Sequence, residues 1–250
     1  FSRCPFPVWP SVGNHDLRGN FHARFPGFDD GNGFVQYTVE LPELRLVTID
    51  TLEEGRHGGA FCDTRAAWLD AELAKEPVKP TYIVMHHPPI ESGIEWMNTH
   101  PDEPWVAAFT EVVRRHPQVR GLICGHLHRS VTVAWEGRTI AICSSTAPQV
   151  SLDLRPIDAD HPDDRPMIIA DPPGYALHLW ENGQLVTHFD TVDDHEVDAL
   201  RYGVHSPRVL WRSSIPITKC TGSPLSRWYR AIASAPTFSS AWPRCGGPLA

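Results

Sequence analysis

Three short histidine-bearing motifs stand out: GNHD at 13–16, HHPP at 86–89 and GHLH at 125–128. Imidazole nitrogens suit Zn, Fe, Mn and related ions, and an Asn carbonyl oxygen suits a hard cation. Two such ions ~3.5–4 Å apart can clamp the attacking and leaving oxygens of a phosphoryl displacement, and each lowers the pKa of a bound water. The motifs therefore predict a metal site with hydrolytic chemistry.

Each motif follows a segment that can position it. We expect 6–12 to be the end of a strand and 17–25 a short helix, with the first motif between them. The second and third motifs come directly after apolar runs at 80–85 and 119–124, which are predicted to be buried strands. Ligands of α/β proteins gather at the carboxyl ends of strands. With one residue between them, His126 and His128 need a turn after Gly125 to bring both imidazoles toward one site.

Taken singly, the motifs are weak evidence. An Asn-His pair is more often a turn than a ligand pair, and HHPP can be an ordinary strand exit. A lone core histidine is usually a hydrogen-bonded structural residue, the interpretation we give His178 and His188. A serine or cysteine hydrolase fits poorly, because the chain has no G-x-S-x-G and Cys124 lies inside a predicted buried strand. Three motifs in order, all at strand ends, favour the metal site.

The remaining elements alternate helix and strand and then end in consecutive strands, which predicts the α/β class. A helix is expected over 63–76 with Asp63 as its N-cap, and another over 104–116 with Pro104 in its first turn. A long Pro- and Asp-rich loop is expected over 144–173. Hairpins are predicted for 34–40 with 44–50, 130–135 with 138–143, and 175–180 with 184–190.

Composition limits the function classes. The chain has 250 residues, of which 41% are apolar and 21% charged, and no run reaches the ~18 apolar residues of a spanning helix. Its net charge of −8 argues against nonspecific binding to nucleic acid or to an anionic membrane. The six cysteines are scattered without a C-x-x-C pair, so we expect a reducing compartment and a cytoplasmic location. The chain begins with Phe1, so a signal peptide is neither seen nor excluded.

The last segment differs from the rest. Residues 1–198 contain all 30 acidic residues, whereas 199–250 contain seven Lys and Arg, many Ser and Pro, and no acidic residue. No period of 2 or 3.6 runs through 199–250, which predicts either a poorly ordered tail or an aberrant end of the translated sequence. We therefore divide the chain into a domain at 1–198 and a tail at 199–250.

The three motifs together resemble the calcineurin-like metallophosphoesterases. The order and spacing of GNHD, VMHHPP (84–89) and GHLH suit that family, most closely its bacterial branch of cyclic-nucleotide phosphodiesterases and glycerophosphodiesterases. SGIEWMN at 92–98 and GYALHLWENGQLVTH at 174–188 are also similar to this branch. The resemblance covers residues 5–192.

The resemblance implies a four-layer α/β/β/α sandwich with two metal ions (Fe, Mn, Zn or Co) at one edge. Asn14, His86 and His126 match the positions that hold one ion, and His128 matches a ligand of the other. His15 matches the histidine beside the scissile phosphate, and we expect Asp16 to orient it. The substrate would be a small phosphodiester, either a 3′,5′-cyclic nucleotide or a glycerophosphodiester, with no nucleic acid polymer or membrane as partner. His87 is expected to be structural.

One departure from the family bears on activity. Its Asp-x-His and Gly-Asp motifs, the second of which supplies the carboxylate that bridges the ions, have no counterpart before Gly13. We expect an N-terminal βαβ portion to be missing, so that a longer parent is the enzyme and this chain alone binds metal poorly. A phosphomonoesterase or protein phosphatase on the same fold, or a catalytically incomplete metal-binding chain, are the alternatives. Assembly into a homo-oligomer is left open.

Overall fold

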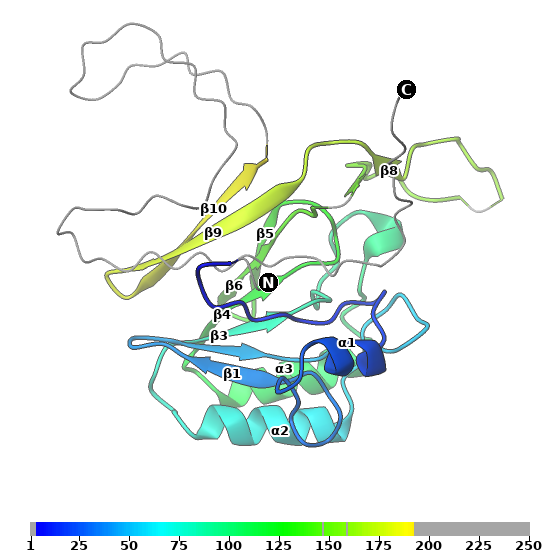
Figure 1. Cartoon of the computed structure of the whole chain (residues 1–250). Helices are drawn as coiled ribbons and strands as arrows, with labels where there is room; N and C mark the ends of the chain where they lie inside the picture. The colour runs from blue at the N-terminus through cyan, green and yellow to red at the C-terminus, as the bar shows by residue number, and fades with distance from the viewer. Residues whose placement is uncertain (1–3, 147, 159, 193–250) are drawn as a thin grey trace, which may run out of the picture.

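A six-stranded sheet forms the centre of the computed structural model, which describes residues 4–146, 148–158 and 160–192 (Figure 1). Its strand order is β1-β2-β3-β4-β6-β5. The four middle strands run parallel, and the edge strands β1 and β5 are antiparallel to their neighbours. The bounds are β1 Tyr37–Glu40, β2 Arg45–Thr48, β3 Thr81–Met85, β4 Val119–Cys124, β5 Val131–Trp135 and β6 Arg138–Ile142.

Two helices cover one face of this sheet, α2 (Asp63–Ala74) and α3 (Pro104–Arg115) (Figure 1). Pro104 suits the first turn of α3, because a proline there removes an N–H that would have no helical partner. Side chains from both helices and from β2, β3, β4 and β6 form the largest buried apolar cluster, which includes Val47, Leu69, Ile83, Phe109 and Leu122. This packing holds β3 and β4, the strands that precede the second and third motifs.

The opposite face of the sheet is covered by an antiparallel hairpin of β9 (Gly174–Glu181) and β10 (Gln184–Thr191). Trp180 of β9 packs edge-on against Tyr82 of β3, and both lie beside a second cluster that contains Leu46. Leu46 and Val47 are neighbours in β2 yet belong to clusters on opposite faces, so the middle strands are buried on both sides. The α/β class is confirmed, and the described layers are helices, sheet and hairpin.

The smaller elements connect these layers. The short helix α1 (Arg18–Arg24) follows the first motif, as predicted, and the 3₁₀ helix η1 (Glu95–Met97) follows the second. The strands β7 (Gln149–Val150) and β8 (Ile168–Ile169) pair within the segment predicted to be entirely loop. None of the described helices is both long and apolar enough to span a bilayer.

Three local predictions are wrong. Residues 6–12 form no strand, because Pro7 and Pro10 lack the N–H donors of a ladder and no described strand pairs with this run. Asp63 is not the N-cap of α2, because it is already helical and the residue before the helix is Cys62. His188 is not a core histidine, because it is exposed on β10, whereas His178 is buried. The predicted tail, 199–250, lies outside the described residues.

Candidate metal centre

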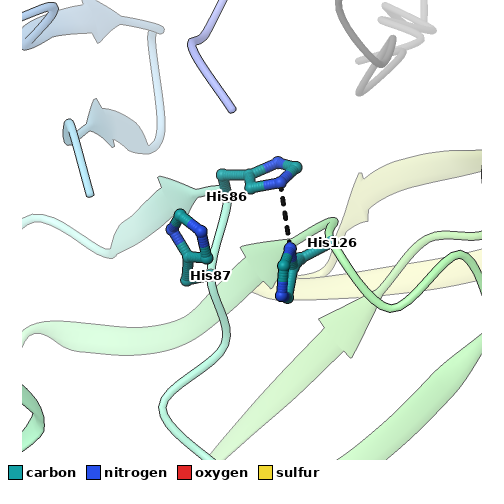
Figure 2. A group of neighbouring side chains, drawn as sticks. All are labelled: His86, His87 and His126. Atoms are coloured by element: carbon teal, nitrogen blue, oxygen red, sulfur yellow. Dashed lines mark hydrogen bonds between the residues drawn. The ribbon is translucent and has the colours of Figure 1, made fainter. Parts of the chain in front are cut away.

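The carboxyl ends of β3 and β4 bring two of the predicted ligands together. These strands are parallel neighbours, with Met85 opposite Cys124, so the residues that follow them emerge side by side. The Gly125 N–H donates to the His86 carbonyl at 3.1 Å and extends the pairing one step beyond the strands. The Nδ1 atom of His126 then lies 3.3 Å from Nε2 of His86 (Figure 2).

Asn14 reaches the same point from the first motif. The turn 13–16 is closed by the Asp16 N–H, which donates to the Gly13 carbonyl, and by the Asp16 carboxylate, which accepts from the Gly13 N–H at 2.8 Å. Asn14 Oδ1 lies 2.9 Å from His86 Nε2. A β-carbon at Gly13 would stand only 2.8 Å from the His86 ring, so this approach requires a glycine. Two imidazole nitrogens and one amide oxygen thus converge.

His87 lies beside this group but has both ring nitrogens engaged. The ligand-type nitrogens of His86, His87 and His126 all lie within 4.8 Å of one another. However, His87 Nδ1 is 2.8 Å from the Thr51 hydroxyl, and its Nε2 is 3.1 Å from the His57 carbonyl. Because that carbonyl only accepts, Nε2 carries the proton and Nδ1 accepts from Thr51. No lone pair of His87 is left for an ion, which supports its structural interpretation.

The site holds its imidazoles in the neutral form. Burial, followed by the neighbouring His87, lowers the pKa of His86 well below its usual value. The same two causes lower the pKa of His126 to about 3. Metal binding requires an unprotonated imidazole nitrogen. Both rings are therefore neutral at neutral pH, which is the charge state that a metal ligand requires.

The third motif turns by means of two residues with left-handed backbones. The φ angles of His126 and His128 are 68° and 50°, a conformation that costs a non-glycine residue about 1–2 kcal/mol. Leu127 between them is fully buried, and this anchors the turn. His128 Nδ1 donates to the Pro148 carbonyl at 2.8 Å, which leaves its Nε2 with a lone pair. The predicted turn after Gly125 is confirmed.

His15 is exposed beside these residues, and sequence analysis missed its neighbour His57. The two rings meet edge-on with centroids 5.8 Å apart. The Asn14 Nδ2 group donates to His57 Nδ1 at 3.3 Å, so the Asn14 oxygen is the end that faces His86. His57 lies in a glycine-rich loop 43 positions from Asn14, and no spacing in the sequence connects the two.

The donor set fits one metal ion, because neutral imidazoles and an amide oxygen suit Zn, Fe, Mn or Co. Within the described part of the chain, no carboxylate joins the cluster of His86, His87 and His126. A two-ion site of the kind the resemblance implies needs such a bridging group, so it is only partly formed here.

Known proteins similar to this chain agree with its fold. No family model matches the chain. The solved structure of GAP50, the anchor in the inner membrane complex of Plasmodium, superposes with a TM-score of 0.50 at 16% identity, and covers 77% of this chain and 65% of that one. At this identity the similarity shows the fold alone.

Curated relatives extend the agreement to sequence. A probable glycerophosphodiester phosphodiesterase of Arcobacter nitrofigilis is 31% identical over 195 residues, which is 77% of this chain and 68% of that protein. A probable cyclic nucleotide phosphodiesterase of Rhodopseudomonas palustris is 35% identical over 193 residues, or 73% of this chain and 65% of that one. The chain thus spans about two thirds of the length of these relatives. It belongs to the bacterial cyclic-nucleotide and glycerophosphodiester phosphodiesterase family of the metallophosphoesterases.

Proposed function

We propose that this chain carries part of the active site of an enzyme that hydrolyses a small phosphodiester to a phosphomonoester. The substrate class is a 3′,5′-cyclic nucleotide or a glycerophosphodiester, the two named in the relatives. The observation that carries the proposal is the convergence of Asn14, His86 and His126 at the ends of two parallel strands. No other arrangement of chemical groups described above offers a comparable site.

Asn14 Oδ1, His86 Nε2 and His126 Nδ1 would hold one ion, and His128 Nε2 would hold a second. When bound, the ions supply Lewis-acid stabilisation of the phosphoryl oxygens. The left-handed backbones of His126 and His128 support this assignment, because strain of this kind collects at functional sites. Fe, Mn, Zn and Co all remain suitable metals.

His15 is proposed to protonate the leaving oxygen or to stabilise charge on the phosphoryl group. Its exposed position beside the ligand cluster supports this role. Asp16 already accepts a hydrogen bond from the Gly13 N–H. Its influence on His15 would therefore act through the shape of the turn as well as through charge.

The experiment uses a longer parent protein that contains these residues, with bis(p-nitrophenyl) phosphate as substrate. His126→Ala should lower turnover by at least about a hundredfold, because one ion loses a ligand. His161→Ala, an exposed histidine in the loop after β7, is the matched control and should be neutral. Unchanged turnover in His126→Ala would overturn the assignment.

Substrate preference distinguishes the proposed phosphodiesterase from the alternative, a phosphomonoesterase, which would turn over p-nitrophenyl phosphate faster than the diester. No carboxylate joins the histidine cluster among the described residues, which favours a second candidate, a chain that binds metal without catalysis. That candidate predicts metal binding but no turnover of either substrate. Cytoplasmic location and oligomeric state stay predictions.

A further inference from the structure

Cys62 occupies an unusual position outside the metal centre. Its thiol is exposed, and it is the residue that precedes the 12-residue helix α2. It lies in the wall of a surface hollow of about 650 Å³ that also contains Phe34, Gly59 and Trp105. The free N–H groups at the start of a helix favour negative charge, which for a cysteine means the thiolate.

Arg65 provides an independent feature of the same hollow. Only 6% of this residue is exposed, and one of its guanidinium nitrogens donates to the carbonyl oxygens of Asp50 and Leu52 and lies 3.8 Å from the Asp50 carboxylate. Its Nε atom is buried and has no hydrogen-bond partner among the described residues. The guanidinium lies 4.8 Å above the Phe34 ring, and both side chains line the hollow. The charge of the guanidinium is thus paired with Asp50, but a buried N–H without an acceptor is costly, so the hollow is suited to receive a polar group that accepts this hydrogen bond.

The charges around Cys62 come from four parts of the chain. Partial burial raises the pKa of the Cys62 thiol, but the N–H and the guanidinium of Arg65 outweigh it, and the pKa ends below that of an ordinary cysteine. Arg18 of α1 also interacts with the Cys62 charge. The charged residues in the wall of the hollow are Arg18, Glu53, Glu54, Arg56, Asp63, Arg65 and Glu103.

We propose that Cys62 is an oxidative modification site, at which a thiolate in this hollow reacts with a small peroxide. The sulfur attacks one peroxide oxygen, an S–O bond forms and the O–O bond breaks. Hydroxide leaves, the sulfur is oxidised by two electrons to the sulfenic acid, and the peroxide is reduced. The unpartnered Nε–H of Arg65 then has an oxygen to which it can donate.

The experiment compares cysteines within the intact 250-residue chain. Limiting iodoacetamide is added between pH 5.5 and 9, and each cysteine-containing peptide is quantified by mass spectrometry. Cys4 is the internal control because it is exposed but precedes no described helix, and buried Cys124 should not react. At pH 7, Cys62 should be alkylated at least about fivefold faster than Cys4, with its pH midpoint displaced downward. Hydrogen peroxide followed by dimedone should label Cys62 in preference to Cys4.

The variant Arg65→Gln tests the donor, and it should slow both reactions at Cys62 while leaving Cys4 unchanged. Because Arg65 also supports two carbonyl groups, this variant can fail to fold, and the comparison with Cys4 in the unaltered chain then decides. Equal alkylation of Cys62 and Cys4 at every pH would overturn the proposal. Dimedone labelling confined to other cysteines would also overturn it.

Discussion

The buried imidazole of His178 should make the folded chain sensitive to acid. His178 lies in β9 with 3% of its surface exposed, and its Nδ1 is 2.9 Å from the Thr187 hydroxyl across the hairpin. Its Nε2 is buried and has no hydrogen-bond partner among the residues that the structure describes. Protonation would place a charged N–H at a point where no described group accepts it. Burial accordingly lowers the pKa of His178 to about 4.

The sign and size of the effect follow from proton linkage. An unfolded histidine has a pKa near 6.5, so between pH 6.5 and pH 4 the unfolded chain binds the extra proton and the folded chain does not. Stability therefore falls as the pH falls through this window. His178 alone should remove about 2 kcal/mol of unfolding free energy at pH 5 and about 3 kcal/mol below pH 4.

The perturbation is His178→Asn, whose short amide can keep a hydrogen bond to Thr187 but does not titrate. Urea unfolding is measured at pH 7.5 and pH 5. The unaltered chain should lose about 2 kcal/mol more than the variant between these two conditions. Any cavity left by the smaller side chain cancels, because it is present at both pH values. His188→Asn, on the exposed face of β10, is the control and should follow the unaltered chain. Equal acid losses in His178→Asn and the unaltered chain would refute the reasoning.

Three further substitutions test close contacts and packing. Gly13→Ala should raise the Co²⁺ dissociation constant at least about tenfold, because its new carbon would stand 2.8 Å from the His86 ring; unchanged affinity in a metal titration would contradict the contact. Gly121→Ala should destabilise the chain by about 1–3 kcal/mol in urea unfolding, because the new carbon would lie 2.6 Å from the Thr139 carbonyl oxygen in the sheet; a loss below about 0.5 kcal/mol would count against it. Gly19→Ala is the matched control for both, because its added carbon would meet no described neighbour within 4 Å.

Local sequence patterns predicted the convergence of the histidines where the chain passes directly from a strand to a histidine motif. His86 and His126 follow apolar runs that became β3 and β4, and their convergence needs only that these strands be parallel neighbours. His57 could not be predicted in this way, because its contact with Asn14 depends on how a loop folds back rather than on periodicity.

Other features were visible only in part. The turn at GHLH was predicted, but not that both His126 and His128 would take left-handed backbones, since spacing carries no information on φ. Residues 6–12 were predicted to be a strand from their apolar content, although Pro7 and Pro10 in the same run remove ladder donors. The position of Cys62 directly before α2 became evident only once the start of this helix was placed at Asp63 and not one residue later.

Titration of the 250-residue chain with Co²⁺ tests most directly whether Asn14, His86 and His126 form a metal site. Binding is followed by visible absorption and by calorimetry, in the unaltered chain, in Asn14→Ala and His126→Ala, and in the exposed control His161→Ala. We expect one equivalent of Co²⁺ to bind weakly to the unaltered chain and to the control, with a dissociation constant at least about tenfold higher in the two ligand variants. Equal affinity in all four proteins, or no binding to any of them, would contradict it.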